Sequence, residues 1–278
     1  MQTIPFNEVK NNLIGQPGTD RRDAYEAKLA KETGPTMKGI LFSTPMVAAT
    51  NEDRKTMTRR EMKIQPSSTK SLLLIDNTIP VWYYQFAKDD FMRDGSMQHG
   101  EADSIAFTSQ YQPGDILYVR EEHLVTRGAF NDWIVDYKDG TTIIFEEADL
   151  PADTIKRLSA RKTLGKWQRG RFLPKALART FLRVTAVKAE RIQDISQADA
   201  IAEGIEMLLG ESGWSGWKDY IGHKSGASCS NAVSSFQTLW KSINGPDSWN
   251  ANPYVFAYTF QRTDAPHSIL QSSNPSIL

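Results

Sequence analysis

The stretch with the densest reactive chemistry covers residues 51–60 and reads Asn-Glu-Asp-Arg-Lys-Thr-Met-Thr-Arg-Arg. It carries one ammonium group, two hydroxyls and three guanidiniums, and it has almost no apolar content. Because a buried charge needs a partner that this stretch cannot fully supply itself, we expect it to lie outside the core. Two interpretations remain open. The stretch is either a solvated helix end that runs into an edge strand, or a polar cleft in which Lys55 and Thr58 act on a phosphate-bearing substrate.

A second chemically distinctive segment is basic. Residues 156–179 contain nine lysines and arginines and no acidic residue. Trp167 and Phe172 lie within this run. It is either a solvated surface loop or a phosphate-binding surface with aromatic rings on which nucleobases stack. The candidate nucleic-acid-binding residues are Lys162, Lys166, Trp167, Arg169, Arg171 and Lys175.

Other common reactive motifs are missing from the sequence. It has no phosphate-binding Gly-x-x-x-x-Gly-Lys-Ser/Thr, no Gly-x-Gly-x-x-Gly and no His-Glu-x-x-His. The four histidines show no ligand spacing, so we expect them at the surface or in loops. The single Cys229 excludes an internal disulfide and a cysteine-based zinc site. We therefore expect no metal and no cofactor.

The overall composition is that of an ordinary globular protein. The 278 residues are 40% apolar and 24% charged, with a formal net charge of zero. Zero net charge argues against a histone-like polyelectrolyte but permits a local basic groove. The sequence shows neither an apolar run of the ~20 residues that a membrane helix needs nor a signal-peptide core. We expect a cytoplasmic protein in a reducing compartment, and the sequence does not indicate its oligomeric state.

The elements around the first stretch must bring its side chains together. Residues 40–42 predict a short buried strand, and Ser43-Thr44-Pro45 is typical of a helix start. That helix is expected to reach the 51–60 stretch, and a strand is expected to begin near Thr56. Residues three apart in a regular strand point to opposite faces. Lys55 and Thr58 therefore share a cleft only if a helix end or a bulge lies between them.

The rest of the chain predicts further strands at 116–119, 181–187 and 254–260, the last with two apolar or amphipathic faces and hence central or barrel-forming. Residues 72–75 and 81–86 are apolar enough for strands or for a buried helix turn. A hairpin of 133–137 with 141–145 is expected around Asp139-Gly140, with Trp133, Val135 and Tyr137 on one face. Helices are expected over 196–208 and from Ser230 to 243, and loops over 87–109 and 210–229. Glu203 falls on the polar face of the 196–208 helix, where solvent exposure is the default expectation.

These elements predict an α+β protein, namely a small mixed β-barrel with helices and long insertions. Residues 1–36 are polar and rich in glycine and proline, and we expect a flexible or arm-like extension. Residues 263–278 are predicted to form a disordered tail. The domain itself is expected to span 37–262.

The order and placement of several short motifs resemble the ASCH family. The motifs are Arg54-Lys55-Thr56-Met57-Thr58-x-Arg60 and Gly114-Asp115-Ile116-Leu117-x-Val119, followed by the strand at 181–187 and the helix at 196–208. ASCH domains belong to the PUA-like superfamily, which is a compact β-barrel with helices that binds RNA or nucleosides in a cleft. The resemblance covers about 37–262, with insertions near 64–110 and 121–178. It is nearest to small bacterial amidohydrolases that deacetylate 4-N-acetylcytidine, and the whole chain also resembles longer ASCH-like proteins of phages and prophages.

The resemblance implies a Thr-Lys-Glu triad made of Thr58, Lys55 and Glu203. A threonine hydroxyl needs a base at hydrogen-bonding distance, and a lysine is that base only if its pKa falls from ~10.4 toward 7–8. The predicted substrate-binding residues are Arg54, Thr56, Arg59, Arg60 and Arg120. Three functions stay open: an amidohydrolase that acts on an N-acylated cytidine-type nucleoside, a non-catalytic RNA- or DNA-binding module, and a ribonuclease.

Overall fold

The computed structural model describes residues 36–63, 65, 72–74, 81–85, 104–209, 215–222 and 228–266. The predicted extension over 1–36 lies outside these residues except for Thr36, and the predicted tail lies outside them from residue 267 onward. None of the described helices is long and apolar enough to span a bilayer.

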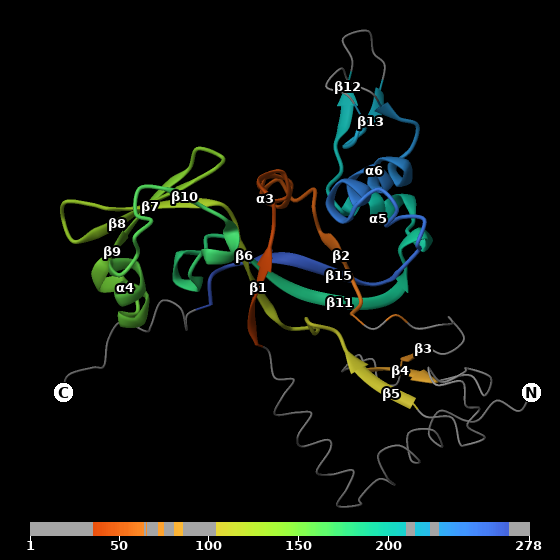
Figure 1. The fold of residues 1–278 in the computed structure, drawn as a ribbon, viewed down its shortest axis with the longest axis horizontal. Helices are drawn as coiled ribbons and strands as arrows, with labels where there is room; N and C mark the ends of the chain where they lie inside the picture. The colour runs from red at the N-terminus through yellow and green to blue at the C-terminus, as the bar shows by residue number, and fades with distance from the viewer. Residues whose placement is uncertain are drawn as a thin grey trace, which may run out of the picture.

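A five-stranded mixed sheet forms the centre of the molecule (Figure 1). Its strands, in spatial order, are β1 (Met37–Leu41), β6 (Ile116–Arg120), β11 (Phe181–Arg191), β15 (Tyr254–Thr263) and β2 (Met57–Glu61). β1 pairs with β6 in parallel, and the other pairs are antiparallel. The strands predicted within these five segments are confirmed. The long β15 lies inside the sheet, as its two apolar faces predict, and it is buried from Tyr254 to Tyr258 and at Phe260, whereas Gln261 and Arg262 are exposed.

Apolar residues cover both faces of the sheet. One face carries a core cluster that includes Phe42, Tyr111 and Tyr258. The other face is covered by α5 (Gln197–Ala202) and α6 (Ala232–Asn244), and Val255 packs there with Phe236 from α6. β2 is an edge strand of the described sheet, so the side chains that cover the two faces come close to each other around it.

α3 (Thr44–Asn51) connects β1 to β2. It begins after Ser43 and carries proline in its first turn, as predicted, although the Ser43 side chain makes no capping hydrogen bond. The chain then turns through Asp53, whose φ is 56°, before β2 begins.

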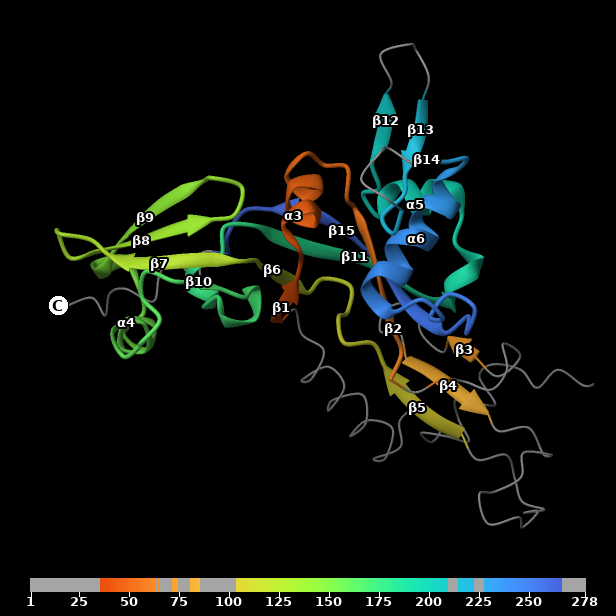
Figure 2. The same cartoon turned by 45° about the horizontal axis from the view of Figure 1, so that its top comes forward.

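A separate lobe lies beside the central sheet (Figures 1 and 2). Its sheet has the order β10 (Trp167–Gln168), β7 (His123–Arg127), β8 (Asp132–Tyr137) and β9 (Thr142–Glu146), with η2 (Glu147–Asp149) and α4 (Ala152–Ser159) following. The predicted β8–β9 hairpin is confirmed, and Trp133, Val135 and Tyr137 are buried on one face. The short helices η3 (Gly170–Phe172) and η4 (Lys175–Leu177) lead from this lobe back to β11. The insertion expected near 121–178 thus contains this sheet.

Two predictions near residue 205 are wrong. The helix ends at Ala202 and not at 208, because Gly204 adopts a φ of +84° that stops it. Residues expected to be loop instead form β13 (Ser215–Lys218) and β14 (Ser228–Cys229). β13 is the middle strand of a small sheet and pairs with β12 (Met207–Leu209) on one side and with β14 on the other. Before these strands, η5 (Ile192–Asp194) leads into α5, and α6 is capped by Asn231 rather than by Ser230.

The insertion expected near 64–110 contains a three-stranded sheet of β3 (Leu72–Leu74), β4 (Val81–Gln85) and β5 (Ser104–Thr108). Of the two possibilities that the sequence left open for 72–75 and 81–86, strands are present and a helix turn is not, whereas β5 falls in a segment expected to be loop. The molecule is therefore α+β, as predicted. Within the described residues, β1 and β2 are the two edges of an open central sheet, and the pairing does not close a barrel.

Candidate functional site

Lys55 lies at the junction between α3 and β2 and is 2% exposed. Its Nζ donates to the Glu203 carboxylate at 2.9 Å and to the Glu203 backbone carbonyl at 2.8 Å. The amine also lies 5.5 Å from the centroid of the Phe42 ring. The amine and the carboxylate of the predicted triad are therefore in direct contact, although 148 residues separate them.

The backbone fixes this contact from both sides. Lys55 forms an isolated β-bridge with Glu203, and the Thr56 amide donates to the Ala202 carbonyl at 2.8 Å. The Lys55 amide donates to the Ala49 carbonyl at the end of α3. The helix end and the turn lie before Lys55 and not between Lys55 and Thr58, and the register of β2 shows no bulge from Thr56 onward. The arrangement that the sequence required for a cleft shared by Lys55 and Thr58 is therefore absent from this segment.

Gly204 permits the close approach of these segments. An added Cβ there would lie 2.8 Å from the Lys55 Cβ and 3.1 Å from the Ala49 Cβ. We expect Gly204→Ala to lower the free energy of unfolding by ~2–5 kcal/mol, because the left-handed backbone costs ~1–2 kcal/mol and the overpacking ~1–3 kcal/mol. Urea denaturation measures this loss. Gly165→Ala is the matched control, because Gly165 also has a positive φ, of 73°, but open space around it. Equal losses in the two variants would show that the contact with Lys55 adds nothing.

Arg59 joins Glu203 to two further carboxylates. Its guanidinium donates to Glu190 at 2.7 and 2.9 Å, to Asp199 at 2.9 Å and to Glu203 at 3.2 Å. The Arg59 side chain is fully buried. It was predicted to contact substrate, but its Nε and both terminal nitrogens already donate to protein carboxylates. Arg59 therefore positions Glu203.

This network corrects two expectations from the sequence. Residues 51–60 were expected outside the core, yet Lys55, Thr58 and Arg59 are 2%, 3% and 4% exposed. Their burial is tolerated because β11 and α5 supply the partners that the stretch itself lacks. Glu203, for which solvent exposure was the default, is 5% exposed. Sequence reasoning also missed Glu190 and Asp199, for which no local motif gives a signal.

Burial and neighbouring charges set the electrostatics of the pair. Burial lowers the pKa of Lys55, the Glu203 carboxylate partly opposes that effect, and Arg60 and Arg59 lower it further. Burial also acts to lower the pKa of Arg59, but Glu203 and Glu190 outweigh it and raise that pKa. Lys55 thus loses its proton more readily than a lysine in water.

Thr58 lies on β2 opposite Tyr258 and is buried. Its hydroxyl makes no hydrogen bond within the described part of the chain, and in particular none to Lys55. Thr58 and Glu203 both line a small cavity of about 60 Å³ beside β2, which is an edge strand of the sheet within the described residues. Met46 from α3 and Leu239, Trp240 and Ile243 from α6 complete most of its wall.

Backbone donors also point toward this edge. The Thr56 carbonyl accepts from Phe260, and the Met62 amide donates to Tyr254. The even-numbered residues of β2 therefore form the backbone hydrogen bonds to β15. The backbone amides of the odd-numbered Arg59 and Glu61 point away from β15. Both residues line the cavity.

The other predicted substrate-binding residues are more dispersed. Arg54 is exposed and pairs with Glu52 at 2.6 Å, whereas Thr56 is half-buried and bonds through its backbone. Arg60 lines the cavity and donates to the Leu41 carbonyl at 2.9 Å. Arg120 lies at the end of β6 and donates to the Arg171 carbonyl at 3.3 Å.

Comparisons of the chain with protein-family models, with curated proteins and with solved structures found no significant match. The assignment of a function therefore depends on the geometry and on the motifs. Within the described ranges, no cluster of histidine, cysteine and acidic residues is suited to hold a metal ion.

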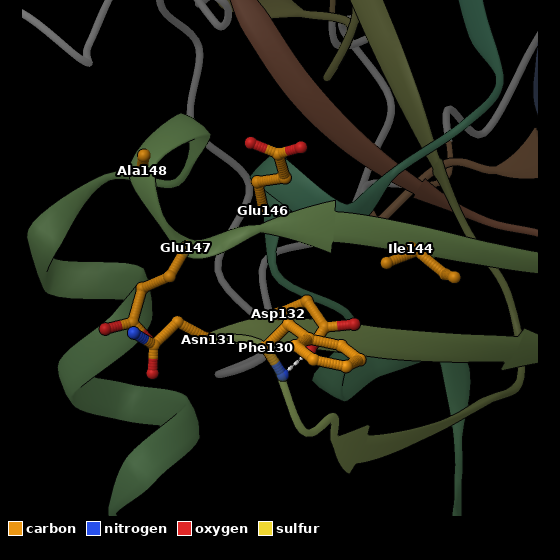
Figure 3. Close-up of a pocket in the computed structure, with 7 residues that line it drawn as sticks. All are labelled: Phe130, Asn131, Asp132, Ile144, Glu146, Glu147 and Ala148. Atoms are coloured by element: carbon orange, nitrogen blue, oxygen red, sulfur yellow. Dashed lines mark hydrogen bonds between the residues drawn. The ribbon is translucent and has the colours of Figure 1, made fainter.

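A larger concavity, of about 600 Å³, lies on the β8–β9 side of the lobe (Figure 3). Asp132, Glu146 and Glu147 line it together with the exposed Phe130 and Ile144. Its lining includes neither a lysine nor an arginine. It therefore does not suit a phosphate-bearing ligand.

His123, expected in a loop or at the surface, is completely buried in β7. Burial lowers its pKa to about 4, so the ring is neutral at physiological pH. Its Nδ1 lies 3.1 Å from the Glu121 carbonyl, and Arg161 lies 3.5 Å from its Nε2. The ring is thus part of the packing of the lobe.

Proposed function

We propose that the protein is an amidohydrolase that removes an acyl group from an N-acylated cytidine-type nucleoside through Thr58, Lys55 and Glu203. The observation that carries the proposal is the buried contact between Lys55 and Glu203, together with a small cavity that Thr58 and Glu203 both line. A structural ion pair explains the contact between Lys55 and Glu203, but it does not account for a threonine and a carboxylate that line the same cavity.

The geometry supports a role for Lys55 as the general base. A neutral amine has two N–H groups, and Nζ has two acceptors on Glu203. The lone pair of the neutral form then points away from Glu203 and is free to accept a proton. The lowered pKa of Lys55 increases the fraction of that form.

The reaction proceeds through an ester of Thr58. The hydroxyl oxygen attacks the acyl carbonyl as its proton passes to Lys55, and the edge amides of Arg59 and Glu61 stabilise the oxyanion. The C–N bond then breaks, and the proton held by Lys55 passes to the leaving nitrogen. Water, with Lys55 again as base, hydrolyses the ester to release the carboxylic acid and restore Thr58.

The same proposal assigns the domain to the ASCH family and to the PUA-like fold. The Lys-Thr-x-Thr motif at the start of β2 and the Gly-Asp-x-Leu motif at the start of β6 support this assignment. The five-stranded sheet with α3, α5 and α6 against it is the part of the molecule that would correspond to the barrel. A phage or prophage origin of the protein is proposed from the sequence resemblance alone.

The decisive experiment is an assay of 4-N-acetylcytidine hydrolysis by the wild type and by Thr58→Val. Valine keeps the shape of threonine but has no hydroxyl, so we expect turnover to fall by at least about 10³-fold. Release of cytidine, followed by chromatography, measures it. Unchanged turnover in Thr58→Val would exclude the threonine as nucleophile. If the wild type shows no turnover either, the function itself is wrong.

The second candidate is a non-catalytic RNA- or DNA-binding module. The exposed aromatic rings in the basic run favour it, since Trp167 is 45% and Phe172 is 50% exposed. Wild-type protein that binds nucleic acid and leaves acetylated cytidine intact would support this module. No specific observation favours the third candidate, a ribonuclease.

A further inference from the structure

The cavity beside Thr58 is too small for a whole nucleoside. Its volume of about 60 Å³ equals the share of about two water molecules in the liquid, whereas small-molecule sites usually hold ~300–1,000 Å³. It has room only for the small acyl end of a substrate. The base, the sugar and any attached phosphate would then have to lie on open surface next to the cavity.

A suitable surface is the basic–aromatic segment, which we define as residues 161–175 together with Lys138. Trp167 and Phe172 are its exposed rings. The Lys138 amine lies 4.0 Å from the centroid of the Trp167 ring, and the Arg171 guanidinium lies 4.8 Å from that of Phe172. The exposed cations of the segment are Lys138, Lys162, Lys166, Arg169, Arg171 and Lys175.

The segment is held in place by the rest of the fold. Trp167 belongs to β10 and pairs with Leu124 of β7. Arg161 donates to the Phe172 carbonyl at 2.6 Å. Gly170 packs so tightly that an added Cβ would lie 2.6 Å from the Arg120 carbonyl oxygen. The two aromatic rings are therefore attached to a fixed backbone.

Contacts connect the segment to the cavity. The same added Cβ at Gly170 would lie 2.9 Å from the side chain of Leu41, which is 50% exposed. The Leu41 carbonyl accepts a hydrogen bond from Arg60, which lines the cavity. In Figures 1 and 2 the chain between β10 and β11 accordingly lies beside β6 and β1. The contacts thus run from Gly170, two residues before Phe172, over Leu41 to Arg60, which lines the cavity.

We infer that the basic–aromatic segment binds single-stranded nucleic acid and leads it over Leu41 to the cavity, so that the modified nucleoside is presented within a polynucleotide. Phosphates pair with the exposed cations, and bases stack on Trp167 and Phe172. Stacking requires unpaired bases, which is why the inference is restricted to single strands. Only the presentation of the substrate rests on the proposed hydrolysis, since strand binding is independent of it.

The test measures binding of a labelled strand of about 12 nucleotides by fluorescence anisotropy, with adenine RNA, adenine DNA, the corresponding duplex and inorganic polyphosphate as separate arms. We expect the single strands to bind, with log K falling against log salt at a slope of about −2 to −3 if three or four phosphates are contacted. Trp167→Ala and Phe172→Ala should each weaken binding by about 5- to 100-fold. Phe130→Ala is the matched control, because Phe130 is 92% exposed but lies among carboxylates, and its binding should not change. Thermal melting confirms that each variant is folded.

Each outcome decides one point. Binding of RNA but not DNA, or of both, identifies the kind of strand and supports the inference. Absence of single-strand binding at low salt, equal binding of polyphosphate or duplex, or no effect of the two aromatic variants overturns it. A wild type that binds the strand but hydrolyses neither free nor strand-embedded acetylated cytidine refutes the proposed function and leaves the surface standing. A wild type that hydrolyses the free nucleoside but binds no strand supports the proposed hydrolysis and refutes the strand-binding surface.

Discussion

Replacing Arg59 by methionine is expected to lower the free energy of unfolding by ~3–5 kcal/mol, the cost of removing one partner from a buried ion pair. Arg59 donates to Glu190, Asp199 and Glu203 at once. After the substitution, Glu203 keeps Lys55 and Glu190 keeps Lys188, whose side chain is 71% exposed. Asp199 is one-third exposed and can be hydrated. The loss therefore arises mainly from Glu190, whose buried carboxylate loses two hydrogen bonds. Urea denaturation measures it.

Two further variants test the origin of this loss. Arg54→Met removes a guanidinium five residues away that is 40% exposed, pairs with the exposed Glu52 and donates a long hydrogen bond of 3.4 Å to the Gly204 carbonyl, and it should cost ~0–1 kcal/mol. The double variant Arg59→Met/Glu190→Gln should be more stable than Arg59→Met alone, because the stranded charge is gone. If the double variant is no more stable, the loss comes from packing of the arginine side chain and not from the stranded carboxylate.

The local sequence pattern predicted the structure correctly where that structure depends on residues close to one another in the chain. The Asp139-Gly140 turn between two β-rich runs predicted the β8–β9 hairpin, and alternation of apolar residues predicted the buried face of Trp133 and Tyr137. The helix predicted over 196–208 shows the opposite case. Apolar spacing continued beyond its true end, and Ile205 is buried although it lies outside the helix. The signal that could have ended it was Gly204.

The site was predicted only in part, for a physical reason. The family resemblance selected Lys55, Thr58 and Glu203, and the contact between Lys55 and Glu203 is present. The partners of Arg59 come from β11 and α5, more than 130 residues along the chain, and no spacing rule connects them. The number of charged groups in residues 51–60 led to the prediction that this stretch lies outside the core. Burial depends on charges of opposite sign that only the tertiary structure brings together.

Replacing Lys55 by methionine is expected to lower the rate of amide hydrolysis by about 10²–10⁴-fold, the usual contribution of a positioned general base. Methionine fills a similar buried volume and cannot accept a proton. Lys188→Met is the matched control, because Lys188 also pairs with a carboxylate of the network but is exposed, and its rate should match the wild type. Because Lys55 is also a buried ion-pair partner, its variant needs thermal melting beside the rate assay, and the comparison is made well below the melting temperature.

The pH dependence separates a base from a structural lysine. Only neutral Lys55 accepts a proton, so the wild-type rate should rise with pH through the pKa of Lys55, at a midpoint below the ordinary 10.5 because burial lowers that pKa. Arg60 contributes to the lowering as a nearby cation, so in Arg60→Gln the pKa of Lys55 should be higher and the midpoint should move to higher pH. A lysine that only holds Glu203 in place has no reason to show this alkaline shift. A rate that is flat across the range, or a midpoint that stays fixed in Arg60→Gln, would leave Lys55 as an ion-pair partner and place the base elsewhere.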